Sequence, residues 1–345
     1  MKAAVFYGPE DMRVGDVPQP AIEDTELLVK VAACAVCGSD VRTFRHGARN
    51  ISKPVVLGHE ISGTVAEIGA QLSGFSIGQR VAVAPAIPCG TCRYCRRNAE
   101  TMCDRLRSIG YEFDGGLAEF LSVPASAVRA GCVNTVPDHV SFEEAAIAEP
   151  LACVINAQEL TGVGDGDTVL VMGAGPVGCL HVGLAKVRGA AKTMLVDIRP
   201  ERLELAAPFG ADVVIDGSRE DVRARVLEET GGDGASVVIV AAPSNRAQEQ
   251  SVMLAARRGR VNFFGGLPKT NPIISLDANV VHYRELSIIG SYGSRPAHNR
   301  MALELIASGR LRTLPLIGLE LPLDRVLDGL QAIEQGRVLK VIVRP

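Results

Sequence analysis

The sequence lacks the features of a membrane span, a secretory leader and a nucleic-acid-binding field. No uninterrupted apolar run reaches the roughly 18 residues that a membrane-spanning helix needs. The opening residues, MKAAVFYGPEDMRVGD, contain no apolar core of a signal peptide, so we expect a cytoplasmic location. The formal net charge is −3, so no basic field attracts the chain to nucleic acid or to a membrane surface.

A disulfide framework is also unexpected, although nine cysteines are present. An odd number of cysteines without a secretion signal does not fit paired structural disulfides. Free cysteine packs as a small apolar side chain, and four are expected in the core: Cys34, Cys132, Cys153 and Cys179. Four others crowd into the fifteen residues 89–103, a density that indicates metal binding.

The chain has 345 residues with 47% apolar and 22% charged side chains, which is typical of a globular protein with two domains. Up to about residue 150, short strands alternate with glycine and proline, as in 26–31, 63–69 and 80–83. This pattern predicts an irregular barrel or sandwich.

From residue 167 onward, buried strands alternate with helical stretches, which predicts a doubly wound parallel sheet. Its six predicted strands are Thr168–Met172, Thr193–Val196, Asp212–Ile215, Ser236–Val240, Arg260–Phe264 and Leu286–Ile289. The final apolar run, 337–343, is predicted to rejoin the first domain as a strand. The first domain is therefore expected to be discontinuous, with the parallel-sheet domain inserted into it.

A glycine-rich segment, Gly173-Ala174-Gly175-Pro176-Val177-Gly178, follows the first of these strands and begins a helix. The pattern is weak alone, but the strand–turn–helix context makes it a dinucleotide fingerprint. Its first glycine forms the tight turn, its second admits the pyrophosphate, and its third allows the helix to pack on the strand. An ordinary strand–helix turn is the alternative.

Asp197 directly follows the second predicted strand. A carboxylate there can accept hydrogen bonds from the adenosine ribose and would repel a 2′-phosphate, which favours NAD over NADP. Arg199 and Arg202 nearby weaken this exclusion of NADP. The alternative is a surface aspartate without a role in binding.

The four crowded cysteines, Cys89, Cys92, Cys95 and Cys103, have the spacing C-x2-C-x2-C-x7-C. Four thiolates on a short loop can close tetrahedrally around one zinc ion. Iron–sulfur binding competes with this interpretation, but ferredoxin motifs continue with three residues and Cys-Pro. Because the protein fills all four ligand positions, we predict a structural zinc ion without chemistry.

A second group of possible metal ligands is dispersed along the chain: Cys37, His59, Glu60 and Glu149. A catalytic zinc needs about three protein ligands and an exchangeable position. Taken singly, each of these residues is more often a core or turn residue, and spacing alone does not connect them.

Together these segments occur in the order seen in one known family. Val36-Cys37-Gly38-Ser39-Asp40, Gly58-His59-Glu60, the cysteine loop, Ala148-Glu149-Pro150-Leu151 and the glycine-rich segment resemble zinc-containing medium-chain dehydrogenases over nearly the whole chain. Glu149-Pro150 makes the sorbitol (polyol) dehydrogenase branch the most similar. The resemblance implies an α/β fold, with a GroES-like β-barrel catalytic domain over 1–155 and 290–345 and a Rossmann NAD-binding domain over 156–289. It also implies a homodimer or homotetramer.

By matching motif positions, the resemblance makes Cys37 and His59 catalytic zinc ligands, and Glu60 and Glu149 direct or water-mediated ligands. Zinc would act as a Lewis acid toward the substrate hydroxyl, and Ser39 would take the proton. The alternative for Ser39 is a turn residue bonded to backbone. The implied NAD site comprises Val177, Asp197, Arg202 and Phe264-Gly265-Gly266.

The implied function is NAD(H)-dependent oxidation of a secondary alcohol of a polyol, cyclitol or sugar-like substrate to a ketone. Arg42 stands where the sorbitol branch often has histidine, and no arginine matches the Arg-Tyr pair expected near Tyr292-Gly293-Ser294. The basic stretch 42–49 makes a sugar-alcohol phosphate an alternative substrate, unless it is a solvated surface loop. A threonine-type amino alcohol is a further alternative.

Two other classes of function compete with a dehydrogenase. An NADPH-dependent quinone or enone reductase shares the fold but generally lacks zinc ligands. A nonenzymatic zinc protein could bind nucleic acid through its cysteine loop, but the acidic net charge and the dinucleotide fingerprint count against it. The expected partner is a small alcohol, with no nucleic acid and no membrane.

Overall fold

The computed structural model describes residues 1–345 and divides them into two compact units. Unit 1 consists of Met1–Ala152 and Gly293–Pro345, and unit 2 of Cys153–Tyr292. The domain boundaries expected from the sequence lie three residues away from these at each junction. None of the helices has the length and apolar character that crossing a membrane requires.

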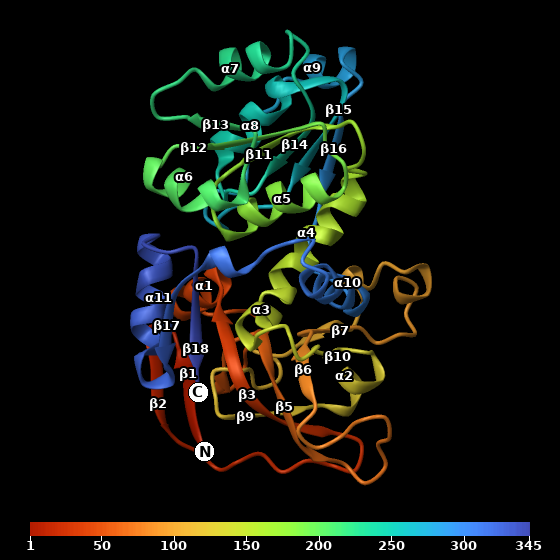
Figure 1. Ribbon diagram of the computed structural model, residues 1–345, viewed down its shortest axis with the longest axis vertical. Coiled ribbons are helices and arrows are strands. Elements are labelled where there is room, and N and C mark those ends of the chain that lie inside the picture. Colours follow the sequence, from red (N-terminus) through yellow and green to blue (C-terminus); the bar gives the residue numbers. More distant parts are fainter. The chain divides into compact units, whose positions relative to one another are not determined.

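Unit 2 contains a six-stranded parallel sheet in the order β13-β12-β11-β14-β15-β16 (Figure 1). Its strands are β11 (Thr168–Met172), β12 (Lys192–Asp197), β13 (Val213–Asp216), β14 (Ala235–Val240), β15 (Ala255–Phe263) and β16 (Ser287–Gly290). This is the strand order of a dinucleotide-binding sheet, so the predicted doubly wound fold is confirmed. Strand β15 begins five residues earlier than predicted, because Ala255 still pairs with Ala235 before the register shifts.

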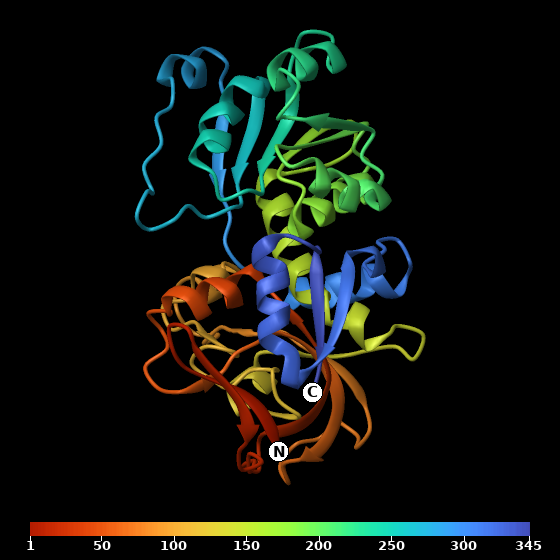
Figure 2. The same cartoon turned by 90° about the vertical axis from the view of Figure 1, so that its left-hand side faces the viewer.

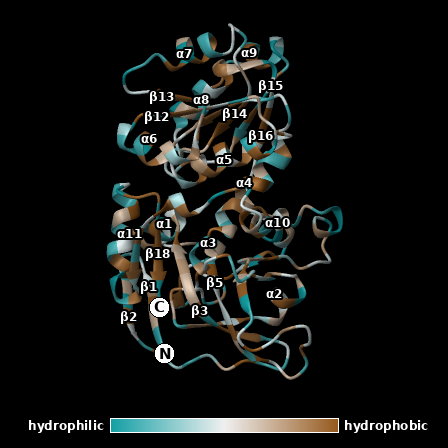
Figure 3. Ribbon diagram, viewed as in Figure 1, coloured by the Kyte–Doolittle hydropathy of each residue, from teal (hydrophilic) through white to brown (hydrophobic).

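The helices of unit 2 connect these parallel strands: α5 (Pro176–Val187), α6 (Pro200–Ala206), α7 (Val222–Glu229), α8 (Asn245–Leu254) and α9 (Ala278–Tyr283). The central strands are apolar and buried, as Val169, Val171 and Val238 show with no exposed area. A parallel sheet covered on both faces requires such continuous apolar strands. Figure 3 shows this as brown strands, with hydrophilic residues on the helices.

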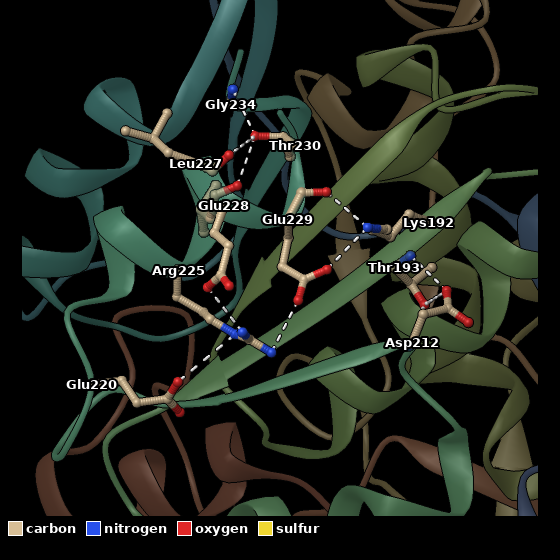
Figure 4. Close-up of polar contacts among 11 residues, drawn as sticks. Lys192, Thr193, Asp212, Glu220, Arg225, Leu227, Glu228, Glu229, Thr230 and Gly234 are labelled. Atoms are coloured by element: carbon tan, nitrogen blue, oxygen red, sulfur yellow. Dashed lines mark hydrogen bonds and ion pairs between the residues drawn. The ribbon is translucent and has the colours of Figure 1, made fainter. Parts of the chain in front are cut away.

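A polar network attaches α7 to the start of β12 (Figure 4). The Lys192 ammonium donates to the backbone oxygen of Glu229 at 2.7 Å and to its carboxylate at 3.0 Å. Arg225 contacts the carboxylates of Glu228 and Glu229, each at 3.0 Å. These groups are partly exposed, so each pair contributes less than about 1 kcal/mol. We assign the network a structural role.

Unit 1 contains a seven-stranded sheet in the order β10-β6-β5-β3-β18-β17, with β9 also paired to β3, and two smaller sheets, β2-β1-β4 and β7-β8. Its strands are β1 (Lys2–Gly8), β2 (Asp11–Asp16), β3 (Leu27–Val36), β4 (Val55–Val56), β5 (Glu60–Ile68), β6 (Arg80–Val83), β7 (Ala86–Ile87), β8 (Arg107–Ser108), β9 (Phe120–Val123), β10 (Val133–Thr135), β17 (Ile317–Pro322) and β18 (Lys340–Arg344). Its helices are α1 (Gly38–His46), α2 (Ala125–Arg129), α3 (Phe142–Ala146), α10 (Pro296–Ala307) and α11 (Val326–Gln335), and α4 (Ala148–Thr161) continues into unit 2.

The last strand of the chain returns to unit 1 and pairs with β3. Strand β18 runs antiparallel to β3, with Ile342 opposite Ala35, and α11 packs beside β17 and β18 (Figure 2). On the other side of β3, Ala35 also pairs with Glu60 of β5. The order β5-β3-β18 therefore brings the beginnings of β5 and β18 next to the end of β3, where Cys37 follows.

Inside α5, the buried His181 makes the stability of unit 2 depend on pH. Burial lowers its pKa from 6.5 to about 3, and Nε2 of His181 has no hydrogen-bond partner. Nδ1 lies 3.3 Å from the Gln158 amide, and the ring meets Phe264 edge-on at 4.8 Å. The imidazole is therefore neutral in the folded chain.

Below a pH of about 6.5 the unfolded chain binds a proton at His181 that the folded chain rejects until about pH 3, so stability falls as the pH falls through this window. Between pH 7 and pH 5, we predict that the free energy of unfolding falls by roughly 2 kcal/mol more in the unchanged chain than in His181→Asn. Urea unfolding at both pH values measures this difference. An exposed control, His282→Asn, should keep the original pH dependence, and an identical dependence in His181→Asn would contradict the prediction.

Candidate active site and cofactor site

Cys37 lies at the point where β3 ends and α1 begins. It is the N-cap residue of α1, so its thiol lies at a helix terminus that favours negative charge. Asp40, in the first turn, accepts the backbone N–H of Cys37 at 2.9 Å. The helix start therefore fixes both the thiol and a buried carboxylate.

His59 lies immediately before β5 and shares Asp40 with Cys37. Oδ1 of Asp40 lies 3.3 Å from Nδ1 of His59, which leaves Nε2 on the opposite side of the ring. Burial lowers the pKa of His59, but Asp40 and Tyr111 oppose it and raise the pKa well above its usual value. A carboxylate behind a histidine is the usual arrangement around a metal-binding imidazole.

Glu60 is the first residue of β5 and is fully buried. Its Oε1 pairs with the ammonium of Lys340, which is also buried and lies within 3.4 Å of the backbone oxygen of Val36. Burial raises the pKa of Glu60, Lys340 opposes this effect, and the nearby carboxylate of Glu149 adds to it. The second oxygen, Oε2, is buried without a hydrogen-bond partner.

These residues offer the ligand set of a catalytic zinc site. The ligand atoms of Cys37, His59 and Glu60 all lie within 4.8 Å of one another. One sulfur, one imidazole nitrogen and one carboxylate oxygen suit zinc and leave a fourth position for an exchangeable ligand. The unpartnered Oε2 of Glu60 is a buried acceptor that a cation would satisfy. The residues therefore fit the metal that the sequence implied.

Glu149, the fourth predicted ligand, stands apart from this group. It lies in the first turn of α4 and is close enough to affect the pKa of Glu60, but its carboxylate is not within the 4.8 Å set. Of the two predicted carboxylates, the structure brings only Glu60 to Cys37 and His59.

Ser39 lies beside the metal-facing side of His59. Its hydroxyl is 3.3 Å from Nε2 of His59, which is the ring nitrogen that Asp40 leaves available. The basic stretch that follows is largely used elsewhere, because Arg45 is paired with Glu10 at 2.9 Å and Glu334 at 2.7 Å. Arg42 and Arg49 are exposed, so the surface-loop interpretation fits this stretch better than a pocket for an anion.

The four cysteines of the loop converge as a separate cluster, with all four sulfurs within 4.8 Å of one another. Sγ of Cys95 lies 4.0 Å from that of Cys89 and 3.5 Å from that of Cys92. Zn–S bonds of about 2.3 Å place tetrahedral sulfurs about 3.8 Å apart. Backbone N–H groups of Thr91 and Cys92 lower the pKa of Cys89 to about 5, which favours its thiolate. The loop fits a closed structural zinc site.

In unit 2, the glycine-rich turn has the geometry of a phosphate-binding loop. Gly173 has a φ of +112°, and a Cβ atom on Gly178 would lie 1.9 Å from the backbone oxygen of Gly173. Gly175 caps α5 and has open space around its Cα, and Pro176 occupies the first helical turn before Val177. The N-terminus of α5 is thus accessible to a pyrophosphate.

Next to this turn, a cavity of about 610 Å³ opens at the carboxyl ends of β11 to β14. Its lining includes Gly173, Asp197, Gly217, Ala242, Ser244 and Met253. The Asp197 carboxylate accepts the N–H groups of Ala174 at 2.7 Å and Arg199 at 2.9 Å, which fixes its orientation. Arg202, predicted to contact the cofactor, does not line this cavity, and its Nη1 is buried without a hydrogen-bond partner.

The turn after β15 closes onto the same region. A Cβ atom on Gly265 would lie 2.6 Å from the backbone oxygen of Ala242, whereas Gly266 has open space around it. Gln248 donates to the backbone oxygen of Gly265 at 2.9 Å and holds the turn. Small residues are thus required where this turn passes β14.

Sequence reasoning assigned no role to three residues that the structure places around the metal ligands: Asp40, Lys340 and Tyr111. Asp40 was visible inside the Cys37 motif, and a buried lysine could have been suspected in the apolar run 337–343. Tyr111 lies between motifs, and no local signal identifies it.

The comparisons with known proteins agree with both sites. Residues 23–135 match the alcohol dehydrogenase GroES-like domain and residues 176–308 match the zinc-binding dehydrogenase domain. The chain is 32% identical to a D-arabitol-phosphate dehydrogenase from Enterococcus avium, over 97% of this chain and 94% of the relative. It is also 32% identical to a sorbitol dehydrogenase from Bacillus subtilis, over 100% and 97%.

A solved structure extends the agreement to the backbone. The putative zinc-binding dehydrogenase from Sinorhizobium meliloti 1021 bound to NADP superposes with a TM-score of 0.93 at 32% identity, covering 100% of this chain and 99% of that one. Three findings agree on the family of this chain. They are the metal-ligand set in a GroES-like unit, the dinucleotide turn in a Rossmann unit, and the relatives that match along the full length. The chain belongs to the zinc-containing medium-chain dehydrogenases, in their polyol dehydrogenase-like branch, and is an oxidoreductase that uses zinc and a nicotinamide cofactor.

Proposed function

We propose that the protein oxidises a secondary hydroxyl of a polyol, cyclitol or sugar-like substrate to a ketone with NAD⁺. The observation that carries the proposal is the convergence of Cys37, His59 and Glu60 within 4.8 Å. A quinone or enone reductase on the same fold has no use for this ligand set. Nucleic-acid binding through the cysteine loop gains no support, because that loop already forms a compact four-sulfur cluster.

Cys37, His59 and Glu60 hold the metal, with Glu149 as a nearby second carboxylate, and Asp40 keeps the imidazole of His59 turned toward it. A zinc ion held by these residues would supply Lewis acidity toward the substrate hydroxyl, and a bound nicotinamide would supply the hydride acceptor. The Ser39 hydroxyl, 3.3 Å from Nε2 of His59, accepts the substrate proton as it gives its own hydroxyl proton to a solvent water. The relay requires no charged serine, since one hydroxyl proton arrives as another leaves.

The preference for NAD⁺ over NADP⁺ rests on Asp197. Its carboxylate is fixed by two backbone N–H groups, and its remaining lone pairs can accept the hydroxyl groups of the adenosine ribose. A 2′-phosphate at the same place would meet a negative charge. The relative of known structure is bound to NADP, which makes the choice of cofactor a necessary part of the test.

A screen of zinc-replete protein tests the proposal. Its substrates are sorbitol, xylitol, ribitol, myo-inositol, their phosphates and L-threonine, each with NAD⁺ and with NADP⁺. We expect formation of NADH with at least one unphosphorylated polyol, and a kcat/KM for NAD⁺ at least about tenfold above that for NADP⁺, the effect of roughly 1.4 kcal/mol. A marked gain with phosphates would favour the sugar-alcohol phosphate alternative.

Turnover with L-threonine alone would favour the amino-alcohol alternative. Equal turnover with both cofactors would remove Asp197 from its role, and no reduction of either cofactor by any alcohol would reject the proposal.

We also propose that two copies associate through the edge of the parallel sheet in unit 2, giving a homodimer or, with a further contact, a homotetramer in the cytoplasm. Strand β16 ends the strand order, so one side of it is unpaired, and the apolar side chain of Ile288 within it is exposed. A second copy would pair this edge. Light scattering should give a dimer or tetramer that Ile288→Lys weakens, and a monomer at all concentrations would contradict the proposal.

A further inference from the structure

A tight turn after β8 carries an aromatic side chain to the metal ligands. The backbone oxygen of Ser108 accepts the N–H groups of Tyr111, Glu112 and Phe113 at 3.1 to 3.3 Å. The Glu112 carboxylate in turn accepts the N–H of Ser108 at 2.9 Å. The side chain of Glu112 thus stabilises the turn and fixes the backbone position of Tyr111.

This turn is locked onto the segment that ends in His59. Gly110 has a φ of +83°, and a Cβ atom there would lie 2.8 Å from the backbone oxygen of Gly58. The same oxygen accepts the N–H of Gly116 at 2.9 Å, and Ile109 is fully buried. Close contacts to the backbone oxygen of Gly58 thus pack the turn against the residue that precedes His59.

Within this turn, the Tyr111 ring lies beside the ring of His59. Its centroid is 5.8 Å from that of the His59 ring, at an interplanar angle of 43°. Burial raises the pKa of the Tyr111 phenol, whereas His59 and the Ser39 hydroxyl act to lower it, which places the phenol close to Ser39. Tyr111 is partly exposed at this position, as contact with a small molecule requires.

We propose that the Tyr111 hydroxyl contacts the substrate and selects molecules with a second hydroxyl on the carbon next to the reacting one. The inference rests on the proposed alcohol oxidation and adds a specificity determinant to it. Ser39 serves the hydroxyl that reacts, and the adjacent phenol is a rigid neutral donor and acceptor suited to the next hydroxyl. A phenol placed to bond a substrate hydroxyl is left without its partner by an analogue that lacks this group, so such an analogue is rejected.

The test compares 2,3-butanediol with 2-butanol, which differ only in the neighbouring hydroxyl. We expect the unchanged enzyme to prefer the diol by about tenfold to a hundredfold in kcat/KM. In Tyr111→Phe this ratio falls to below about threefold, because kcat/KM for the diol falls much more than kcat/KM for 2-butanol. Tyr7→Phe, an exposed tyrosine on β1, is the matched control and should keep the original ratio.

Calorimetric titration of both compounds into zinc-replete protein with NADH gives a readout without turnover. The diol should bind more tightly than 2-butanol in the unchanged protein and with nearly equal affinity in Tyr111→Phe. A ratio that survives the substitution, or an equal loss for both compounds, overturns the inference. If neither compound is turned over, but the diol binds more tightly than 2-butanol and Tyr111→Phe removes this difference, the proposed oxidation is rejected and the role of Tyr111 is kept.

Discussion

Replacing His59 with alanine reduces kcat/KM by at least about 10³-fold, the effect of losing roughly 4 kcal/mol of transition-state stabilisation. Nε2 of His59 is the only nitrogen in the ligand set, and Ser39 lies against the same atom. The substitution therefore removes a metal ligand and, at the same time, the side chain that the Ser39 hydroxyl contacts. Cys37→Ser should have a comparable effect, because a hydroxyl is a poor substitute for a thiolate ligand.

Cofactor binding should survive these changes, because every group assigned to it belongs to residues 153–292. Titration with NADH, followed by its fluorescence, measures this, and metal analysis should show one zinc ion per chain in place of two. His282→Ala, an exposed histidine of α9, is the control and should keep full activity. Turnover within tenfold of the unchanged enzyme in either ligand variant would reject zinc catalysis.

The features that could be predicted from sequence are those formed by residues that lie close together in the chain. The four cysteines lie on one loop, so their spacing alone predicts the cluster that the structure forms. The glycine-rich turn is equally local, since Gly178 must approach Gly173 five residues earlier. In the parallel sheet, apolar strands of about five residues alternate with helices, and this alternation sufficed to predict a doubly wound sheet of six strands.

The proposed catalytic ligands lie far apart in the sequence, and pairing of distant strands brings them together. Cys37 follows β3 and Glu60 begins β5, and only the register that sets Ala35 opposite Glu60 makes them neighbours. The family resemblance supplied this connection where spacing did not. It still treated Glu60 and Glu149 alike, whereas the structure places Glu60 with the other ligands and Glu149 outside them.

Lys340 received no role from the sequence, and its loss should have the largest effect on stability. The run 337–343 was predicted as an ordinary apolar strand, yet Lys340 is only 2% exposed and Glu60 is 0% exposed. Removing one partner of a buried ion pair leaves an uncompensated charge, which destabilises a protein by about 3 to 5 kcal/mol. We therefore predict that Lys340→Met lowers the melting temperature on the order of 10 °C.

A double variant separates the lost charge pair from lost packing. In Lys340→Met combined with Glu60→Gln, no buried charge remains unpaired, so most of the lost stability should return. Lys2→Met breaks an exposed pair with Asp324 in the same unit and should change stability by less than about 1 kcal/mol. Urea unfolding of the three variants decides the matter. Two outcomes would contradict the prediction: a loss of stability in Lys340→Met no larger than in Lys2→Met, or a double variant less stable than Lys340→Met. Either would show that Lys340 is not the counter-ion that keeps Glu60 charged.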